Sequence, residues 1–138
     1  MKPSPAEALV SLYQSLSPAQ LSALKRGDWR AIPAGDDAQS ICLLKLRQRY
    51  AEMVARQWLL PLYGRAYVVR LELPASALAT FELGSVAYAE HLEYRVPAAH
   101  LPRLAIRLQS PVRVVSAFRP QHSYSLPAGG GPLLALMG

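Results

Sequence analysis

Residues 65–73 constrain the fold of this chain more than any other segment. Their side chains alternate with a period of two, which is typical of a β-strand. One side of that strand carries large apolar residues, namely Tyr67, Val69, Leu71 and Leu73. The other side carries Ala66, Val68, Arg70 and Glu72. A chain with this segment must build a sheet, because a single strand cannot bury its apolar side alone.

Two helices are predicted around this strand. The first has Ser17 as its N-cap and Pro18 at its first position, and it should end near Gly27, directly after two cations. The second covers residues 47–60 and should stop at Pro61. Its apolar face would consist of residues at three-to-four spacing: Tyr50, Met53, Val54, Gln57 and Trp58.

The remaining elements are short and closely spaced. Strands are predicted at residues 39–44, 86–88, 92–96 and 112–118, with a strand or a helical turn at 9–14 and short helices at 74–81 and 97–101. Short connections between neighbouring strands favour a mixed, largely antiparallel α+β fold over a doubly wound parallel sheet. We expect one domain over residues 9–119, with a lead-in at 1–8 and a flexible Pro/Gly tail at 120–138. The predicted core includes Trp58, Tyr67, Val69, Leu71 and Phe118.

Composition excludes several classes of protein. Cys42 is the single cysteine, so an internal disulfide is excluded and a reducing, cytoplasmic location is favoured. No apolar run approaches the roughly 18 residues that a membrane span needs, and the N-terminus does not have the pattern of a signal peptide. The three histidines lack the spacing of a metal motif, so no metal site is predicted.

Positive charge accumulates towards the C-terminus. The net charge is +6, and no acidic residue follows Glu93, whereas five arginines do: Arg95, Arg103, Arg107, Arg113 and Arg119. They form either a solvated basic face or an anion-binding surface. A nucleic-acid-binding protein is one reading of this charge, but few aromatic residues are interleaved with the cations. We therefore expect any nucleic-acid binding to be weak and to fall steeply with salt.

The segment around Glu93 is the most informative about chemistry. On a strand, His91 and Glu93 point the same way, which would place an imidazole and a carboxylate on one exposed face. Such a pair can orient a sugar hydroxyl and stabilise positive charge that develops on a ribose carbon. An ordinary polar strand face would have the same sequence.

The same segment resembles a small bacterial family labelled ADP-ribosylation/crystallin-like, which is related to ADP-ribosyltransferases. The family pattern opens with Leu-Tyr-Arg, has a Gly-Tyr-Val-Thr-Arg-Phe-Glu-Val strand, continues with His-x-Glu-Tyr-Trp-x-Pro-Ala-Glu and closes with a Pro-Ile-Glu-Val-Ile strand. The matching segments here are residues 12–14, 66–73, 91–98 and 111–118. The resemblance covers about residues 12 to 118 and is carried by the order and spacing of these segments.

The resemblance implies a split α+β fold that cradles NAD and transfers ADP-ribose to an acceptor, as a toxin or effector does. By position Glu93 matches the glutamate that orients the ribose, and His91 matches a second polar residue of the site. Tyr13, Gln14 and Ser40 would form the floor of the cleft and bind the cofactor. Replacement of Glu93 by Gln should then lower any transfer or NAD-cleaving activity by about a hundredfold or more and leave folding intact.

Three departures from the family pattern open an alternative. Gln14 stands where the family has an arginine, and a neutral amide cannot pair with a phosphate as a cation does. Cys42 and Leu43 replace an aromatic pair, and Arg95 replaces a tryptophan. The alternative is a catalytically degenerate member of the fold that binds a protein or a nucleotide. The sequence predicts no membrane partner and leaves the oligomeric state open.

Overall fold

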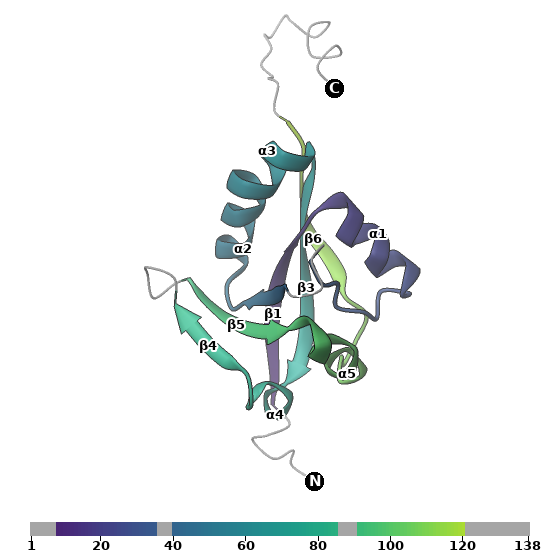
Figure 1. Cartoon of the computed structure of the whole chain (residues 1–138), viewed down its shortest axis with the longest axis vertical. Coiled ribbons are helices and arrows are strands. Elements are labelled where there is room, and N and C mark those ends of the chain that lie inside the picture. The colour runs from purple at the N-terminus through teal and green to yellow at the C-terminus, as the bar shows by residue number, and fades with distance from the viewer. Residues whose placement is uncertain (1–7, 36–39, 86–90, 121–138) are drawn as a thin grey trace, which may run out of the picture.

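The computed structural model describes residues 8–35, 40–85 and 91–120, which form an α+β domain (Figure 1). Its sheet has six strands in the order β4-β5-β2-β1-β3-β6, and every neighbouring pair is antiparallel. The strands are β1 (Leu9–Leu16), β2 (Ile41–Lys45), β3 (Ala66–Pro74), β4 (Glu82–Ser85), β5 (Leu92–Pro97) and β6 (Arg113–Phe118). The predicted antiparallel α+β class is therefore confirmed.

Backbone pairing in the sheet is least extensive between β1 and β2. Eight residues of β1 pair with β3, from Leu9↔Pro74 to Leu16↔Tyr67, and all five residues of β2 pair with β5. By contrast, β1 and β2 share the single pair Tyr13↔Lys45. Two three-stranded halves thus meet at one point, and side chains near that point decide how the halves are joined.

Helices cover both faces of the sheet (Figure 1). The helical elements are α1 (Pro18–Arg26), α2 (Gln48–Val54), the π-helix η2 (Ala55–Leu59), α3 (Leu60–Tyr63), α4 (Ala75–Leu78), the 3-10 turn η3 (Ala98–His100) and α5 (Leu101–Ile106). The larger core contains leucines of α1, α4 and α5 together with β3 residues such as Val69 and Leu71. A smaller core lies under α2 and η2 and includes Ala66 and Val68. The predicted division of β3 into two faces is therefore confirmed.

Helix α1 begins as its sequence predicts. The Ser17 hydroxyl accepts a hydrogen bond from the Gln20 backbone amide at 3.3 Å, and the Gln20 side chain accepts one from the Ser17 amide at 2.9 Å. This reciprocal pair satisfies two amides that the first turn leaves without partners. Since every group involved lies within four residues, the sequence alone was enough to place this end.

The second predicted helix differs from expectation beyond Val54. The helical segment does not stop at Pro61 but continues through the π-helix η2 into α3 and ends at Gly64, whose φ of 76° is left-handed. A π-helical turn is wider than an α-helical turn, so it changes the angular position of the residues that follow. Trp58, predicted to be core, is 65% exposed, and that prediction was wrong. Val69 and Leu71 are buried as predicted, whereas Tyr67 and Phe118 are half-buried.

Other boundaries are also settled by the structure. Pro102 lies in the first turn of α5 and does not end a helix, since a proline needs no amide partner there. The strand predicted at 86–88, the start of the lead-in and residues 121–138 of the tail lie outside the described residues. Within the described residues, no helix has the length and apolar character required to cross a bilayer.

Candidate functional site

A single row of residues crosses all six strands at the junction of the two half-sheets. The registers connect Gly84 to Glu93, Glu93 to Lys45, Lys45 to Tyr13, Tyr13 to Arg70 and Arg70 to Arg113. Directly paired residues of antiparallel strands lie on the same face of the sheet. Glu93, Lys45 and Tyr13 therefore share the face that α2 covers, and Glu93 lies near the centre of the fold.

Glu93 is enclosed by partners. Its carboxylate Oε1 accepts a hydrogen bond from the Tyr50 hydroxyl at 2.9 Å and lies 3.9 Å from the Lys45 ammonium. Glu93 is only 2% exposed and Lys45 only 4%. The sequence predicts an exposed pair at this position, but α2 packs over it and brings Tyr50 onto the carboxylate.

His91 lies at the outer side of this cluster. Its ring stacks on Tyr50 with centroids 4.4 Å apart and planes 6° from parallel. The Lys45 ammonium lies 5.3 Å from the centroid of the same Tyr50 ring. Tyr50 therefore contacts His91 as well as the buried charges, and because Glu93 is buried, His91 and Glu93 do not form the exposed pair that their spacing indicates.

The electrostatics of the cluster follow from its burial. Burial lowers the pKa of Lys45, because an ammonium ion loses its hydration there, and the Glu93 carboxylate opposes this shift. Burial and, secondly, the hydrogen bond to Glu93 raise the pKa of Tyr50 to about 12. The carboxylate is thus held by a neutral donor and a buried cation. A carboxylate held in this way joins β2, β5 and α2 and is closed to a substrate in this conformation.

Gln14 occupies the opposite face of the sheet from Glu93. Its side-chain amide donates to the Pro33 carbonyl at 2.8 Å and to Cys42 Sγ at 3.3 Å. Burial raises the pKa of the Cys42 thiol to about 12, which keeps it protonated and unreactive. Gln14 therefore connects β1, β2 and the 30–34 segment where the two half-sheets separate.

Ser40 comes one residue before β2. Its carbonyl accepts from the Ala98 amide at 3.3 Å, while its hydroxyl is buried and has no hydrogen-bond partner in the described part of the chain. Of the residues expected to form a floor beneath Glu93, the register places Tyr13 on the Glu93 side and Gln14 on the opposite face, and Ser40 lies outside the paired residues of β2. The expected single floor is therefore not what the structure assembles.

Lys45 and Tyr50 are the residues of this cluster that the sequence did not single out. Lys45 follows an apolar strand, where a lysine normally marks the solvated end, and it gave no sign of burial. Tyr50 was expected on the apolar face of its helix, and it is buried there. A tyrosine on a buried helix face needs a partner for its hydroxyl, which was the one available signal.

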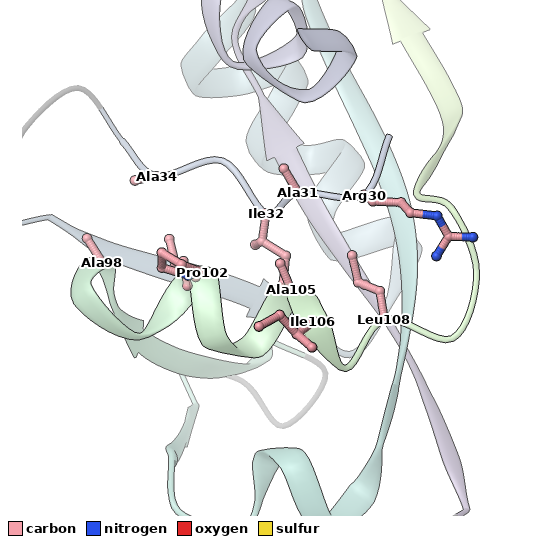
Figure 2. Close-up of a pocket in the computed structure, with 10 residues that line it drawn as sticks. Arg30, Ala31, Ile32, Ala34, Ala98, Pro102, Ala105, Ile106 and Leu108 are labelled. Carbon is pink, nitrogen blue, oxygen red and sulfur yellow. The ribbon is translucent and has the colours of Figure 1, made fainter. Parts of the chain in front are cut away.

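An open pocket lies on the other side of the sheet, between residues 30–34 and α5 (Figure 2). Its volume is about 560 Å³, and its lining is mainly aliphatic, from Ala31, Ile32, Ala34, Ala98, Leu101, Pro102, Ala105, Ile106 and Leu108. Arg30 also contributes, but Figure 2 shows its guanidinium group directed away from the aliphatic side chains. Ile106 is 81% exposed at this pocket, although isoleucine is normally buried.

The late arginines are divided among several places. Arg103 and Arg107 line a pocket with α4, Arg119 lines another with Arg65, and Arg113 lines a third with Arg70. Arg95 instead lies 3.9 Å from the Glu82 carboxylate. The positive charge that is continuous in sequence is therefore presented to ligands as separate small surfaces.

Comparisons with known proteins do not indicate a function for this chain. No family model, curated protein or solved structure matches this chain significantly. Among the residues that the structure describes, no group of three or more metal-ligating side chains could hold an ion. The Glu93 cluster and the open pockets are therefore the features of the molecule that bear on its function.

Proposed function

We propose that this chain is a catalytically degenerate relative of the ADP-ribosyltransferase-like proteins that acts as a protein-binding module. The relationship rests on the residue pattern from Leu12 to Phe118. The observation that carries the binding role is the aliphatic pocket between residues 30–34 and α5. Its volume of about 560 Å³ is within the range typical of ligand-binding sites.

The lining of this pocket favours an apolar anchor over a nucleotide. A nucleotide carries phosphates that need hydrogen-bond donors or cations, and the side chains gathered in the pocket are aliphatic. An aliphatic or aromatic side chain of a partner protein would instead bury apolar surface against Ile32, Ala105 and Ile106. Ile106 would lose most of its exposed surface in such a complex.

The environment of Glu93 supports the loss of transferase activity. A catalytic glutamate must reach the ribose of a bound dinucleotide, and Glu93 is instead held by Tyr50 and Lys45 beneath α2. Gln14 is engaged with Pro33 and Cys42 on the opposite face. A dinucleotide that used both residues would have to contact both faces of the sheet.

The first test of this proposal is titration of the wild-type chain with NAD. We expect neither saturable binding by calorimetry nor release of nicotinamide on long incubation. Micromolar binding of NAD with release of nicotinamide would contradict the proposed loss of catalysis and support the transferase hypothesis.

The second test selects short peptides on the immobilised chain from a random display library and measures them by fluorescence anisotropy. We expect the selected peptides to share an aliphatic or aromatic anchor and to bind at least about tenfold more weakly to Ile106→Glu, since the anchor would meet a carboxylate. Leu62→Glu is the matched control, because Leu62 is 72% exposed on α3 and distant in sequence from the pocket. Equal loss in both variants, or none in Ile106→Glu, would contradict binding at this pocket.

A further inference from the structure

A second pocket lies on α5 beside α4 and has a different chemistry from the aliphatic pocket. Its volume is about 300 Å³, and its lining includes two arginines, a histidine, two hydroxyl groups and an aromatic ring. These belong to Arg103, Arg107, His100, Ser76, Thr80 and Phe81. None of the described residues in the lining is acidic, so the pocket combines hydrogen-bond donors with positive charge.

The two arginines are placed to act together. Arg103 and Arg107 are four residues apart, a spacing that puts side chains on the same side of a helix. Arg107 Nη2 donates to Ser76 Oγ at 3.3 Å, which ties α4 to the end of α5. The Arg103 guanidinium group makes no hydrogen bond or ion pair with any residue that the structure describes. At least one guanidinium group is therefore available to a ligand.

The neighbouring carboxylates are engaged elsewhere. Glu72 lies 3.3 Å from Arg70, and Glu82 lies 3.9 Å from Arg95. Neither lines the pocket, although α4 and the turn that holds Thr80 and Phe81 are close to both in sequence. Among the residues that the structure describes, Arg103 and Arg107 thus have no acidic partner, and their charge favours an anion from outside.

Two aromatic rings beside the arginines favour an anion that carries a planar group. Phe81 and His100 meet edge to face, with ring centroids 5.7 Å apart and planes at 74°. Both residues line the pocket, so a planar group joined to an anion would contact a ring while the anion contacts the arginines. The guanidinium fork and the Ser76 and Thr80 hydroxyls together provide more donors than a single carboxylate can use, but a phosphate has three acceptor oxygens.

We propose that this pocket is a binding site for a phosphate monoester whose phosphate contacts Arg103 and Arg107 and whose organic group lies against Phe81 and His100. The source of that ester is either a nucleoside monophosphate or a phosphorylated side chain of a protein. A nucleic-acid backbone fits less well, because Arg113 and Arg119 line other pockets and do not extend this one.

Phenyl phosphate is the probe for this site, titrated into the 138-residue chain and followed by calorimetry and amide chemical shifts. We expect one saturable site with shifts around α4 and α5, competition by inorganic phosphate and weaker binding of phenyl sulfate, which carries less negative charge. Arg103→Gln should weaken binding about tenfold to a hundredfold, because it removes charge-assisted hydrogen bonds.

Arg113→Gln is the matched control, since it removes the same charge from an exposed arginine on β6. Binding that changes less than about twofold in this variant supports a local site. Equal weakening by both substitutions, shifts spread over all the arginines, or no saturable binding would overturn the proposal. Both variants change exposed side chains, and unchanged far-ultraviolet circular dichroism would verify that they fold.

Two further ligands distinguish the sources. Adenosine monophosphate and a short peptide with phosphotyrosine carry the same ester and different organic groups. Tighter binding of one of them than of phenyl phosphate, lost again in Arg103→Gln, would identify the source. This site does not depend on the aliphatic pocket, so Ile106→Ala, which adds no charge beside Arg103 and Arg107, should leave phenyl phosphate binding unchanged whether or not the protein-binding proposal holds.

Discussion

The Glu93 cluster and the surroundings of α5 are neighbours in sequence and opposite in character. In the Glu93 cluster, Lys45, Tyr50 and Glu93 satisfy one another and exclude solvent. Around α5, ten residues later, Arg103 is exposed without a partner in the described part of the chain, and Ile106 is exposed beside an open pocket. Residues with the chemistry of a catalytic site therefore serve the interior, while residues without a recognisable motif remain available for binding.

The residues that stabilise the fold are therefore different from the residues proposed to bind ligands. Substitutions in the Glu93 cluster should change the free energy of unfolding, because they leave buried polar groups without partners. Substitutions around α5 should change binding and leave that free energy nearly constant. Denaturation of single variants tests this division.

The largest effect is expected from Glu93→Gln. The neutral amide would leave the Lys45 ammonium buried without a counter-charge, at a cost of about 3 to 5 kcal/mol in the free energy of unfolding at neutral pH. Urea denaturation measures this loss. It should shrink at alkaline pH, because burial already lowers the pKa of Lys45 and deprotonation removes the uncompensated charge.

The triple variant Lys45→Met, Tyr50→Phe and Glu93→Leu is the control for this substitution, because it also removes the Tyr50 hydroxyl that would otherwise lose its hydrogen-bond acceptor. Removal of both charges should recover most of the stability, since a buried pair can often be replaced by apolar residues at little cost. A loss below about 1 kcal/mol in Glu93→Gln would show that the carboxylate is hydrated. The transferase hypothesis, in contrast, expects this variant to fold as well as the wild type.

Leu71→Ala provides the reference for an apolar substitution in the larger core. Leu71 is fully enclosed on β3, so truncation should cost about 2 to 5 kcal/mol through lost burial and the cavity left behind. The same urea experiment measures it. An unfolding free energy within 1 kcal/mol of the wild type would mean that the two faces of β3 are reversed.

Tyr50 should make stability depend on alkaline pH. Its folded pKa of about 12 lies above the ordinary value of 10, so the folded state retains a proton that the unfolded state loses. This contribution is complete below pH 10 and is lost as the pH rises towards 12, at no more than about 1.4 kcal/mol per pH unit. Tyr50→Phe should lack this additional decline when urea curves at pH 9 and pH 11 are compared. Parallel declines in both proteins would contradict the assignment to Tyr50.

The smallest effects on stability are expected around α5. Ile106→Glu and Arg103→Gln change exposed side chains and should each alter the free energy of unfolding by no more than about 0.5 kcal/mol. Thermal or urea denaturation of both variants tests this expectation. A loss of several kcal/mol would show that this surface supports the fold and would remove the basis for the two binding proposals.

Features that depend on near neighbours could be predicted from the amino-acid sequence. The alternation of residues 65–73 fixed which side of β3 faces each core, because a strand reverses its side chains at every residue. The capping box fixed the start of α1 for the same local reason. Short links between strands indicated the antiparallel class, since a parallel pair requires a long crossover.

The roles of the candidate residues depend on contacts between distant parts of the chain. Tyr50 reaches Glu93 across 43 positions of sequence, and Gln14 reaches Cys42 across 28, so spacing could not reveal either contact. Trp58 is exposed and lies in a π-helical turn, which no periodic pattern predicts. Burial of a charge is a property of everything packed around it. The sequence could name Glu93 and Arg103, but only the assembled fold enclosed the first and left the second exposed.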